Sequence, residues 1–281
     1  MKRIIGVLIL GMCFFNSTGA TEKEQILLKG DDISEWKGMV KINTSVKHSN
    51  IGSFELYGKY PTELISSQMF PVDMNKTYII SAWMRSLDDH FPASANLGMR
   101  MYDKDRKEIK INNECSYPDT ETSTAADSVI GSKELLVVKN PEWLKIKHSL
   151  IAFNIKEQYQ DLPNFDLSPQ IEKLIDEGAR YKVVLRGPLE KTYPAGTKIR
   201  LHSPWGAPFY WGADGWMPME WKNFSNTIKG EAQNGTPKDK FWKGTKYVRI
   251  FVWFGNWNRI PKEEARLLVD DIKFISMEAE E

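Results

Sequence analysis

Short runs of β-branched and aromatic residues recur along the chain and are separated by turn-forming residues, a pattern typical of an all-β sandwich. The clearest runs cover residues 78–85, 96–102, 246–254 and 267–275. Since successive side chains point to opposite faces of a strand, each run is predicted to bury one face and to expose the other. The pattern therefore predicts an all-β fold.

The alternation also assigns side chains to the two faces of these strands. The inward sets of the first three runs are apolar: Tyr78, Ile80, Ala82 and Met84; Leu97, Met99 and Met101; Val248, Ile250, Val252 and Phe254. The outward set of the third run is itself aromatic, with one arginine: Tyr247, Arg249, Phe251 and Trp253. In the last run, one otherwise apolar face is predicted to hold a carboxylate: Leu268, Asp270, Ile272 and Phe274.

The middle of the chain departs from this rhythm, from about residue 154 to 196. Ser168 followed by Pro169 is a typical helix start, and Gly178 is a typical stop. Between them lies a short apolar stripe: Ile171, Leu174 and Ile175. We therefore predict a helical and loop insertion within one sandwich domain.

The first residues have the order of a secretory signal peptide: a basic start, Met1-Lys2-Arg3, an apolar run to Phe15, and small residues up to Ala20. The apolar run is shorter than the ~20 residues that a membrane-spanning helix needs. We predict cleavage after Ala20, and a protein that is secreted or lies at the cell surface or in the periplasm. Cys13 resembles the cysteine of a lipoprotein cleavage box, although the bulky Met12 stands where that signal prefers a small residue.

The mature chain is predicted to consist of one domain, residues 21–276, and an acidic tail, residues 277–281. It keeps one cysteine, Cys115, so no disulfide can form within it. The net charge of +1, with both signs well mixed, argues against a nucleic-acid partner held by a broad basic surface. The sequence has no Cys-x-x-Cys pair and no histidine cluster, which argues against a transition-metal enzyme.

Four segments, residues 48–56, 70–83, 101–105 and 268–274, together span most of the mature chain. In content and order they resemble the jelly-roll carbohydrate-binding modules, galactose-binding-like β-sandwiches that are appended to bacterial xylanases and endoglucanases. The match is to a pattern and not to a single diagnostic string, and the sequence departs from it at residues 154–244. The resemblance implies a jelly-roll sandwich that binds polysaccharide and has no catalytic activity.

The resemblance also implies a structural calcium ion (Ca2+) between the start and the end of the domain. Asp270 matches the family's carboxylate ligand in the last strand, and further oxygens would come from Asp31, Asp32 and the backbone near Ser53. Calcium takes about 6–8 oxygen ligands and tolerates irregular loops, so this chemistry is reasonable. The alternative is that Asp270 is an ordinary strand-end residue and that the two other aspartates form a solvated turn.

Seven of the ten tryptophans fall in one segment of the sequence: Trp205, Trp211, Trp216, Trp221, Trp242, Trp253 and Trp257. A sugar ring packs its C–H face on a flat indole while its hydroxyls bond to polar neighbours, so aromatic residues mixed with arginines are typical of a glycan-binding face. If the relevant strands lie in one sheet, their outward side chains form such a face: Trp83, Arg85, Arg100, Tyr102, Tyr247, Arg249, Phe251 and Trp253. The alternatives are that the tryptophans form a lid over the sandwich, or that the insertion covers this face.

Arginine pairs with carboxylates and sulfates in two-point geometry, which indicates an anionic polysaccharide, although neutral sugars also accept its hydrogen bonds. Two other functions stay open. A polysaccharide hydrolase or lyase would need paired carboxylates, and those nearest the aromatic segment are Asp214, Glu220 and Glu231. A cell-surface structural or adhesion component would use the sandwich only as a spacer.

Overall fold

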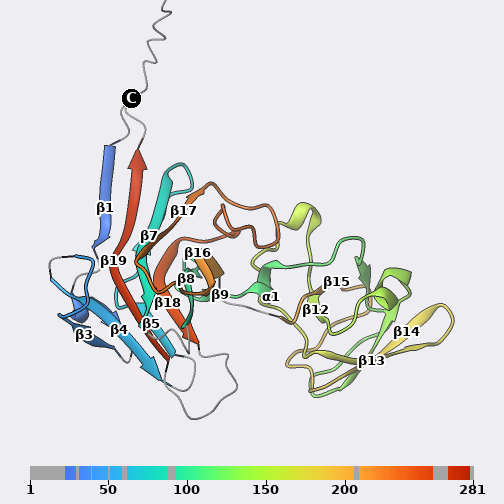
Figure 1. Ribbon diagram of the computed structural model, residues 1–281. Helices are drawn as coiled ribbons and strands as arrows, with labels where there is room; N and C mark the ends of the chain where they lie inside the picture. Colours follow the sequence, from blue (N-terminus) through green and yellow to red (C-terminus); the bar gives the residue numbers. More distant parts are fainter. Residues whose placement is uncertain are drawn as a thin grey trace, which may run out of the picture.

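The computed structural model describes most of the chain after the predicted signal peptide (Figure 1). The described residues are 23–29, 32–38, 40–49, 51–58, 62–87, 93–205, 209–255 and 265–278. The signal peptide, Cys13, Asp31 and the last three residues of the acidic tail lie outside these ranges. Within the part of the chain that the structure describes, no helix is long and apolar enough to cross a membrane.

Two antiparallel sheets form a β-sandwich, which confirms the all-β prediction. The first sheet has the order β17 (Lys222–Lys229), β7 (Thr77–Ser86), β19 (Ala265–Glu278), β4 (Ser53–Gly58) and β3 (Lys41–Asn43), and β1 (Lys23–Lys29) pairs with β19. The second sheet has the order β16 (Phe209–Trp216), β8 (Ser94–Tyr102), β18 (Tyr247–Gly255), β5 (Thr62–Ser66) and β2 (Trp36–Lys37), with β6 (Phe70–Pro71) on β18 and β9 (Glu108–Ile109) on β8. Most consecutive long strands switch sheets, as in a jelly-roll.

The main core lies between these two sheets and is built as the alternation predicts. The inward residues of β7, β8 and β18 that the pattern assigned are all buried in one cluster. In the first sheet, β1 pairs with the last part of β19, where Lys23 lies opposite Glu278. Met277 and Glu278 are therefore strand residues, which corrects the prediction that the tail begins at residue 277.

A β-bulge in β19 corrects the predicted face of the last strand. Pairing with β7 shifts register between Asp270 and Lys273, and Asp271 takes the left-handed conformation with φ of 54°. Before the bulge, Leu267 and Val269 face the core, and after it Ile272 and Phe274 do. Leu268 and Asp270 thus lie on the outer face, because one extra residue reverses the alternation.

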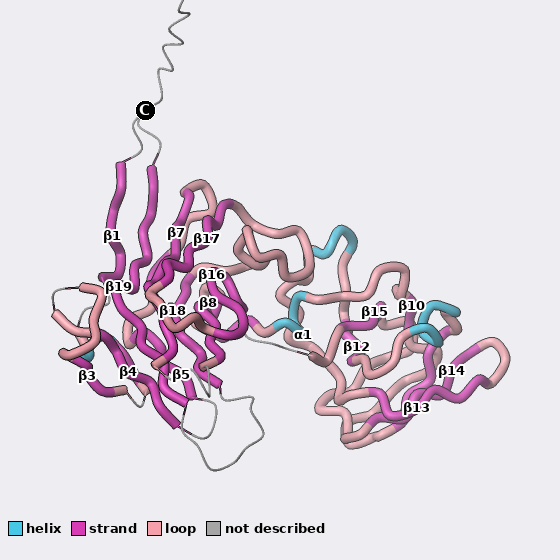
Figure 2. Tube along the Cα trace, in the orientation of Figure 1, coloured by secondary structure: helices cyan, strands magenta, loops and turns pink. Residues whose placement is uncertain are grey.

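Residues 115–205 form a second unit beside the sandwich, with a core of its own (Figures 1 and 2). One small sheet has the order β10 (Thr122–Ser123), β15 (Lys198–His202), β12 (Leu150–Phe153), and the other β11 (Glu134–Val138), β14 (Arg180–Leu185), β13 (Ile171–Asp176). The chain also has one short α-helix, α1 (Ile111–Glu114), and three 3-10 turns, η1 (Ile33–Glu35), η2 (Pro141–Lys145) and η3 (Glu157–Tyr159), among the described residues. The insertion is therefore larger than the predicted 154–196, and it is mostly β.

The helix predicted after Ser168 is wrong, because residues 171–185 form a β-hairpin. Leu174 pairs with Val183 across β13 and β14, and Tyr181, Val183 and Leu185 are buried in the core of the second unit. Gly178, with φ of 86°, belongs to the hairpin turn and donates its N–H to Asp176 Oδ1. A three-residue apolar stripe fits both a helix and a strand, and the partner strand decides between them.

Buried polar groups hold the second unit to the sandwich next to α1. Asn113 and Asn164 exchange hydrogen bonds, and Lys243 Nζ donates to the carbonyl of Tyr159 at 2.8 Å. Glu114 is fully buried, and neither of its carboxyl oxygens has a hydrogen-bond partner. Burial and, secondarily, the nearby charge of Glu231 raise the pKa of Glu114 to about 9, so the carboxyl is protonated at neutral pH.

Candidate functional site

The outer face of the second sheet carries most of the predicted binding residues in register. Directly opposed residues of β8 and β18 form four rows: Tyr102 and Tyr247, Arg100 and Arg249, Gly98 and Phe251, Asn96 and Trp253. Opposed residues in an antiparallel pair share one face of the sheet. Six of the eight predicted residues are therefore neighbours on one surface, which we call the sandwich face.

Arg100 is held rigidly at the centre of the sandwich face. Its Nε and Nη2 donate to the two carboxylate oxygens of Glu63 on β5, both at 2.8 Å, and its Nη1 donates to Glu108 Oε1 on β9 at 2.7 Å. The hydrogen bonds to Glu63 raise the pKa of Arg100 further above its usual range. Two carboxylates thus neutralise this guanidinium, and it has a supporting role more than an anion-binding one.

Arg249, one strand away, has no such partner. Among the described residues its side chain makes no hydrogen bond or ion pair, and its Nε is buried without an acceptor. Tyr102 and Tyr247 lie in the next row, and the guanidinium of Arg106 stands 5.5 Å from the Tyr247 ring centre. Burial, and after it the charge of Glu108, raises the pKa of Tyr102, so its hydroxyl stays a neutral donor. This end of the face combines two phenol rings with free guanidinium donors.

The other end of the sandwich face is more closed than predicted. Phe251 has no exposed surface, and the Arg100 guanidinium lies 5.9 Å from its ring centre. Asn96 is also buried, whereas Trp253 is half-buried. Phe251 therefore has no surface on which a sugar ring could stack, and it serves as a support for Arg100.

Trp83 and Arg85 lie on the outer face of the first sheet, on the opposite side of the sandwich from the other six residues. The premise that all eight share one sheet is thus wrong. The imidazole of His48 stacks on Trp83 with ring centres 3.9 Å apart, and Arg85 stands 6.0 Å from the ring centre of Trp221. These rings cover each other, which leaves Trp83 half-buried.

The described contacts of the predicted calcium ligand Asp270 are with backbone N–H groups. Asp270 Oδ2 accepts the backbone N–H groups of His48 and Ser49 at 2.7 and 2.9 Å, and its Oδ1 accepts that of Asp271. N–H donors directed at a carboxylate compete with a cation for the same oxygens. Asp270 therefore fixes the loop before β4. Calcium binding stays a prediction of the resemblance.

Of the other three predicted ligands, Asp31 lies outside the described residues, and the remaining two have separate roles. Asp32 is exposed, and its carboxylate accepts the N–H of Ser34 at the start of η1. The hydroxyl of Ser53 donates to the carbonyl of Val46 at 2.7 Å. No group of three or more His, Cys, Asp or Glu that could hold a metal occurs in the described ranges.

Two of the three carboxylates considered for catalysis have described side chains, and both are exposed. Glu220 is exposed, and Glu231 is exposed with its Oε1 accepting the N–H of Gly244. Asp214 has its backbone in β16, and its side chain is outside the description. The carboxyl with the pKa of a general acid, Glu114, has no exposed surface. A sealed acid cannot protonate a glycosidic oxygen.

Three partners of the predicted site escaped the sequence analysis. Glu63, Glu108 and His48 each touch a predicted residue across a strand or a loop. Glu63 lies on β5, 37 positions before Arg100 in the chain. Glu63 adjoins the buried Leu64 in a short strand, which gives a signal for an outward charge but none for its partner.

No protein-family model matches the chain, and no curated protein matches its sequence. Among solved structures, the chain is similar to the CBM22-1 xylan-binding domain from Paenibacillus barcinonensis Xyn10C. The TM-score is 0.37 and the sequence identity 8%, over 93% of this chain and 100% of that one. That domain is of the kind that the sequence resembles. A likeness at this level carries no functional argument, and the sandwich is established by its own strand pairing.

Proposed function

We propose that this protein binds polysaccharide without catalysis, on the end of the sandwich face formed by Tyr102, Tyr247 and Arg249. The observation that carries the proposal is the guanidinium of Arg249, whose side chain makes no hydrogen bond or ion pair among the described residues and lies beside the row of Tyr102 and Tyr247. Its terminal Nη groups are not among the buried unsatisfied atoms, so they can donate to a sugar hydroxyl, and a hydrogen bond from a charged donor contributes about 1.5–3 kcal/mol.

The side chains next to Arg249 combine an aromatic ring and a hydroxyl group, the two kinds of group that a sugar ring contacts. Tyr247 is half-buried and offers the open part of its ring to C–H groups, and Tyr102, which is 9% exposed, has a neutral hydroxyl beside it. Arg100 is already fixed by Glu63 and Glu108, so little conformational entropy is lost on binding. Glu63 and Glu108 together carry as many negative charges as Arg100 and Arg249 carry positive ones, and this balance favours a neutral ligand.

Affinity electrophoresis in native gels tests the proposal with a panel of neutral and acidic polysaccharides that includes xylan. We expect Arg249→Ala and Tyr247→Ala each to weaken retention on a neutral polysaccharide by roughly tenfold, with melting temperatures close to that of the wild type. Arg85→Ala is the matched control on the opposite sheet, and it should leave retention unchanged. Loss of retention in Arg85→Ala alone would assign binding to the first sheet and reject this site.

The absence of catalysis has its own readout. Incubation with the retained polysaccharide should release no reducing ends and no unsaturated products. Product release that persists in Arg249→Ala would show an active centre elsewhere in the chain.

A further inference from the structure

Most charged side chains of the second unit neutralise each other. The pairs are Lys139–Asp176, Lys145–Glu142, Arg180–Glu177, Lys182–Glu134, Lys191–Asp166, Lys198–Glu157 and Arg200–Asp161. Among the described residues of this unit, the following cations make no ion pair: Lys133, Lys147, Lys156, Lys173 and Arg186. Three of them, Lys147, Lys173 and Arg186, line one pocket, which we call the cationic pocket.

Backbone pairing brings the three cations together. The N–H of Ile171 donates to the carbonyl of Ser149 at 2.8 Å, which places β13 beside the segment that carries Lys147. The N–H of Arg186 donates to the carbonyl of Gln170 at 2.9 Å, just before that strand. The resulting pocket has a volume of about 320 Å³. All three cations are exposed at its rim.

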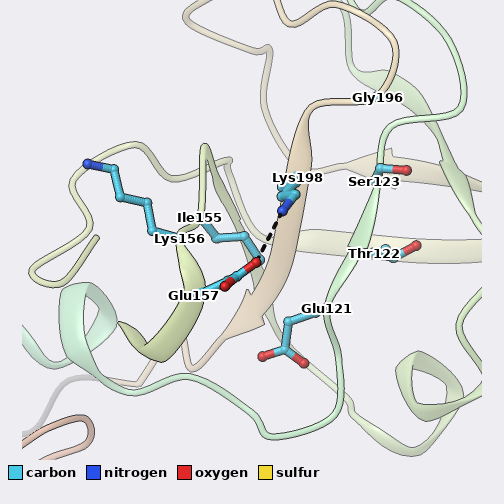
Figure 3. A pocket seen from close by; sticks show the side chains of 8 residues that line it. All are labelled: Glu121, Thr122, Ser123, Ile155, Lys156, Glu157, Gly196 and Lys198. Atoms are coloured by element: carbon cyan, nitrogen blue, oxygen red, sulfur yellow. Dashed lines mark ion pairs between the residues drawn. The ribbon is translucent and has the colours of Figure 1, made fainter. Parts of the chain in front are cut away.

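The balance of charge at this rim favours an anion. The residues that line the pocket include one carboxylate, Glu172, against the three cations. A second pocket of about 490 Å³ shows the contrast, since it is lined by two glutamates, Glu121 and Glu157, and its Lys198 points toward Glu157 (Figure 3). There Lys198 Nζ lies 4.0 Å from Glu157 Oε1. The cationic pocket lacks this internal compensation.

Apolar and aromatic groups accompany the cations. Ile146 and Leu174 line the pocket and are partly buried against the core of the second unit. His148 also lines it, and its imidazole meets the indole of Trp205 edge-on, with ring centres 6.2 Å apart. Trp205 is 67% exposed, unusually open for tryptophan. An exposed indole beside clustered cations suits a sugar ring that carries a negative group.

We propose that the cationic pocket is a second polysaccharide site, selective for acidic sugars, in which Lys147, Lys173 and Arg186 bind a carboxylate or sulfate and Trp205 packs on the ring. This inference deepens the proposed function, because it assigns acidic chains to the second unit and neutral chains to the sandwich face. The two sites differ in ligand and residues, so each can fail alone.

The test is affinity electrophoresis of the full chain and variants in three gels: polygalacturonate, a sulfated polysaccharide, and the neutral polysaccharide retained by the sandwich face. Lys173→Ala/Arg186→Ala should lose roughly tenfold or more of its affinity for the acidic gels, and Trp205→Ala a smaller factor. Retention in the neutral gel should not change. The matched control is Lys133→Ala/Lys156→Ala, which removes the same charge from the same unit outside the pocket.

Each outcome decides for or against the site. Preferential loss in the pocket variant, with thermal unfolding like that of the control, supports it, and the gel that shows the larger loss distinguishes carboxylate from sulfate. Equal losses in pocket variant and control would mean diffuse attraction by net charge and would overturn it. Absence of wild-type retention in both acidic gels would also overturn it, whereas loss of neutral retention in Arg249→Ala would still support the sandwich face.

Discussion

The sandwich face and the cationic pocket both place arginine near aromatic rings, but they differ in how far nearby carboxylates balance its positive charge. On the sandwich face, two carboxylates engage Arg100 at 2.7 to 2.8 Å, and they balance the charges of Arg100 and of Arg249, which lies opposite it in the same row. In the pocket, Lys147, Lys173 and Arg186 have no described acidic partner. The presence of arginine in the sequence therefore does not identify an anionic ligand. What indicates the ligand is whether carboxylates in the fold balance the charge of that arginine.

The two regions also belong to separate cores joined by a small buried junction. The sandwich buries its apolar residues between two large sheets, and the second unit buries its own between two small ones. Separate cores permit one unit to lose structure while the other keeps it. The following predictions test how far this separation extends.

The largest effect is expected from Arg200→Ala in the second unit. Arg200 and Asp161 have side chains only 1% and 5% exposed, and Nη2 lies 2.6 Å from Oδ2. Removing the guanidinium leaves a buried carboxylate unpaired, which costs about 3–5 kcal/mol. Denaturant unfolding should show an early transition of the second unit, while retention by neutral polysaccharide persists. Arg180→Ala is the control, because it breaks the exposed ion pair with Glu177 in the same unit and should change stability little. A single unfolding transition in Arg200→Ala, with loss of retention by neutral and by acidic polysaccharide together, would contradict separate cores.

A smaller effect is expected in the pH dependence of stability, through Glu114 at the junction of the two units. Its pKa rises to about 9 in the folded chain from a reference value of 4.5, so its contribution is full below the lower value and is lost as pH rises through the higher one. The free energy of unfolding should therefore fall by about 2–4 kcal/mol between about pH 5 and about pH 8 through this group. Glu114→Gln should flatten the dependence, measured by denaturant unfolding across pH. An equally steep dependence in Glu114→Gln, with exposed Glu190→Gln as control, would reject this assignment.

Glu63→Gln should make the sandwich face resemble the pocket. Without this carboxylate, Arg100 keeps only Glu108, and the face gains positive charge. Both groups are partly exposed, so we expect a gain of only a few-fold in retention by polygalacturonate, reversed by salt. Glu220→Gln changes the net charge equally at an exposed position and is the control. The same gain in both variants would show that net charge alone acts.

The smallest effect is expected from a calcium chelator. Asp270 accepts three backbone N–H groups in the described structure, and two of them belong to His48 and Ser49 in the loop before β4. The melting temperature should therefore not change when a chelator is added, as measured by differential scanning fluorimetry. A clear decrease, restored by added calcium, would support the ion that the resemblance implies.

Much of the sandwich follows from the sequence, because a strand buried on one face repeats every second residue. That periodicity located β7, β8, β18 and β19 and their inward residues up to the bulge at Asp270. The same periodicity gave a wrong prediction, a helix after Ser168, where the apolar pattern is short. Ile171, Leu174 and Ile175 fit a helix as well as a strand until Tyr181–Leu185 pairs beside them.

The amino-acid sequence by itself determined the fold class and the outward position of Tyr247, Arg249 and Trp253, because alternation along a strand is a local property. Only the tertiary structure decided that Trp83 lies on the opposite sheet, that Glu63 neutralises Arg100 and that Lys173 and Arg186 meet at one pocket. Each of these depends on which strands pair and which residues approach across loops. Such contacts are set by the packing of the whole chain, and no periodicity within one segment encodes them.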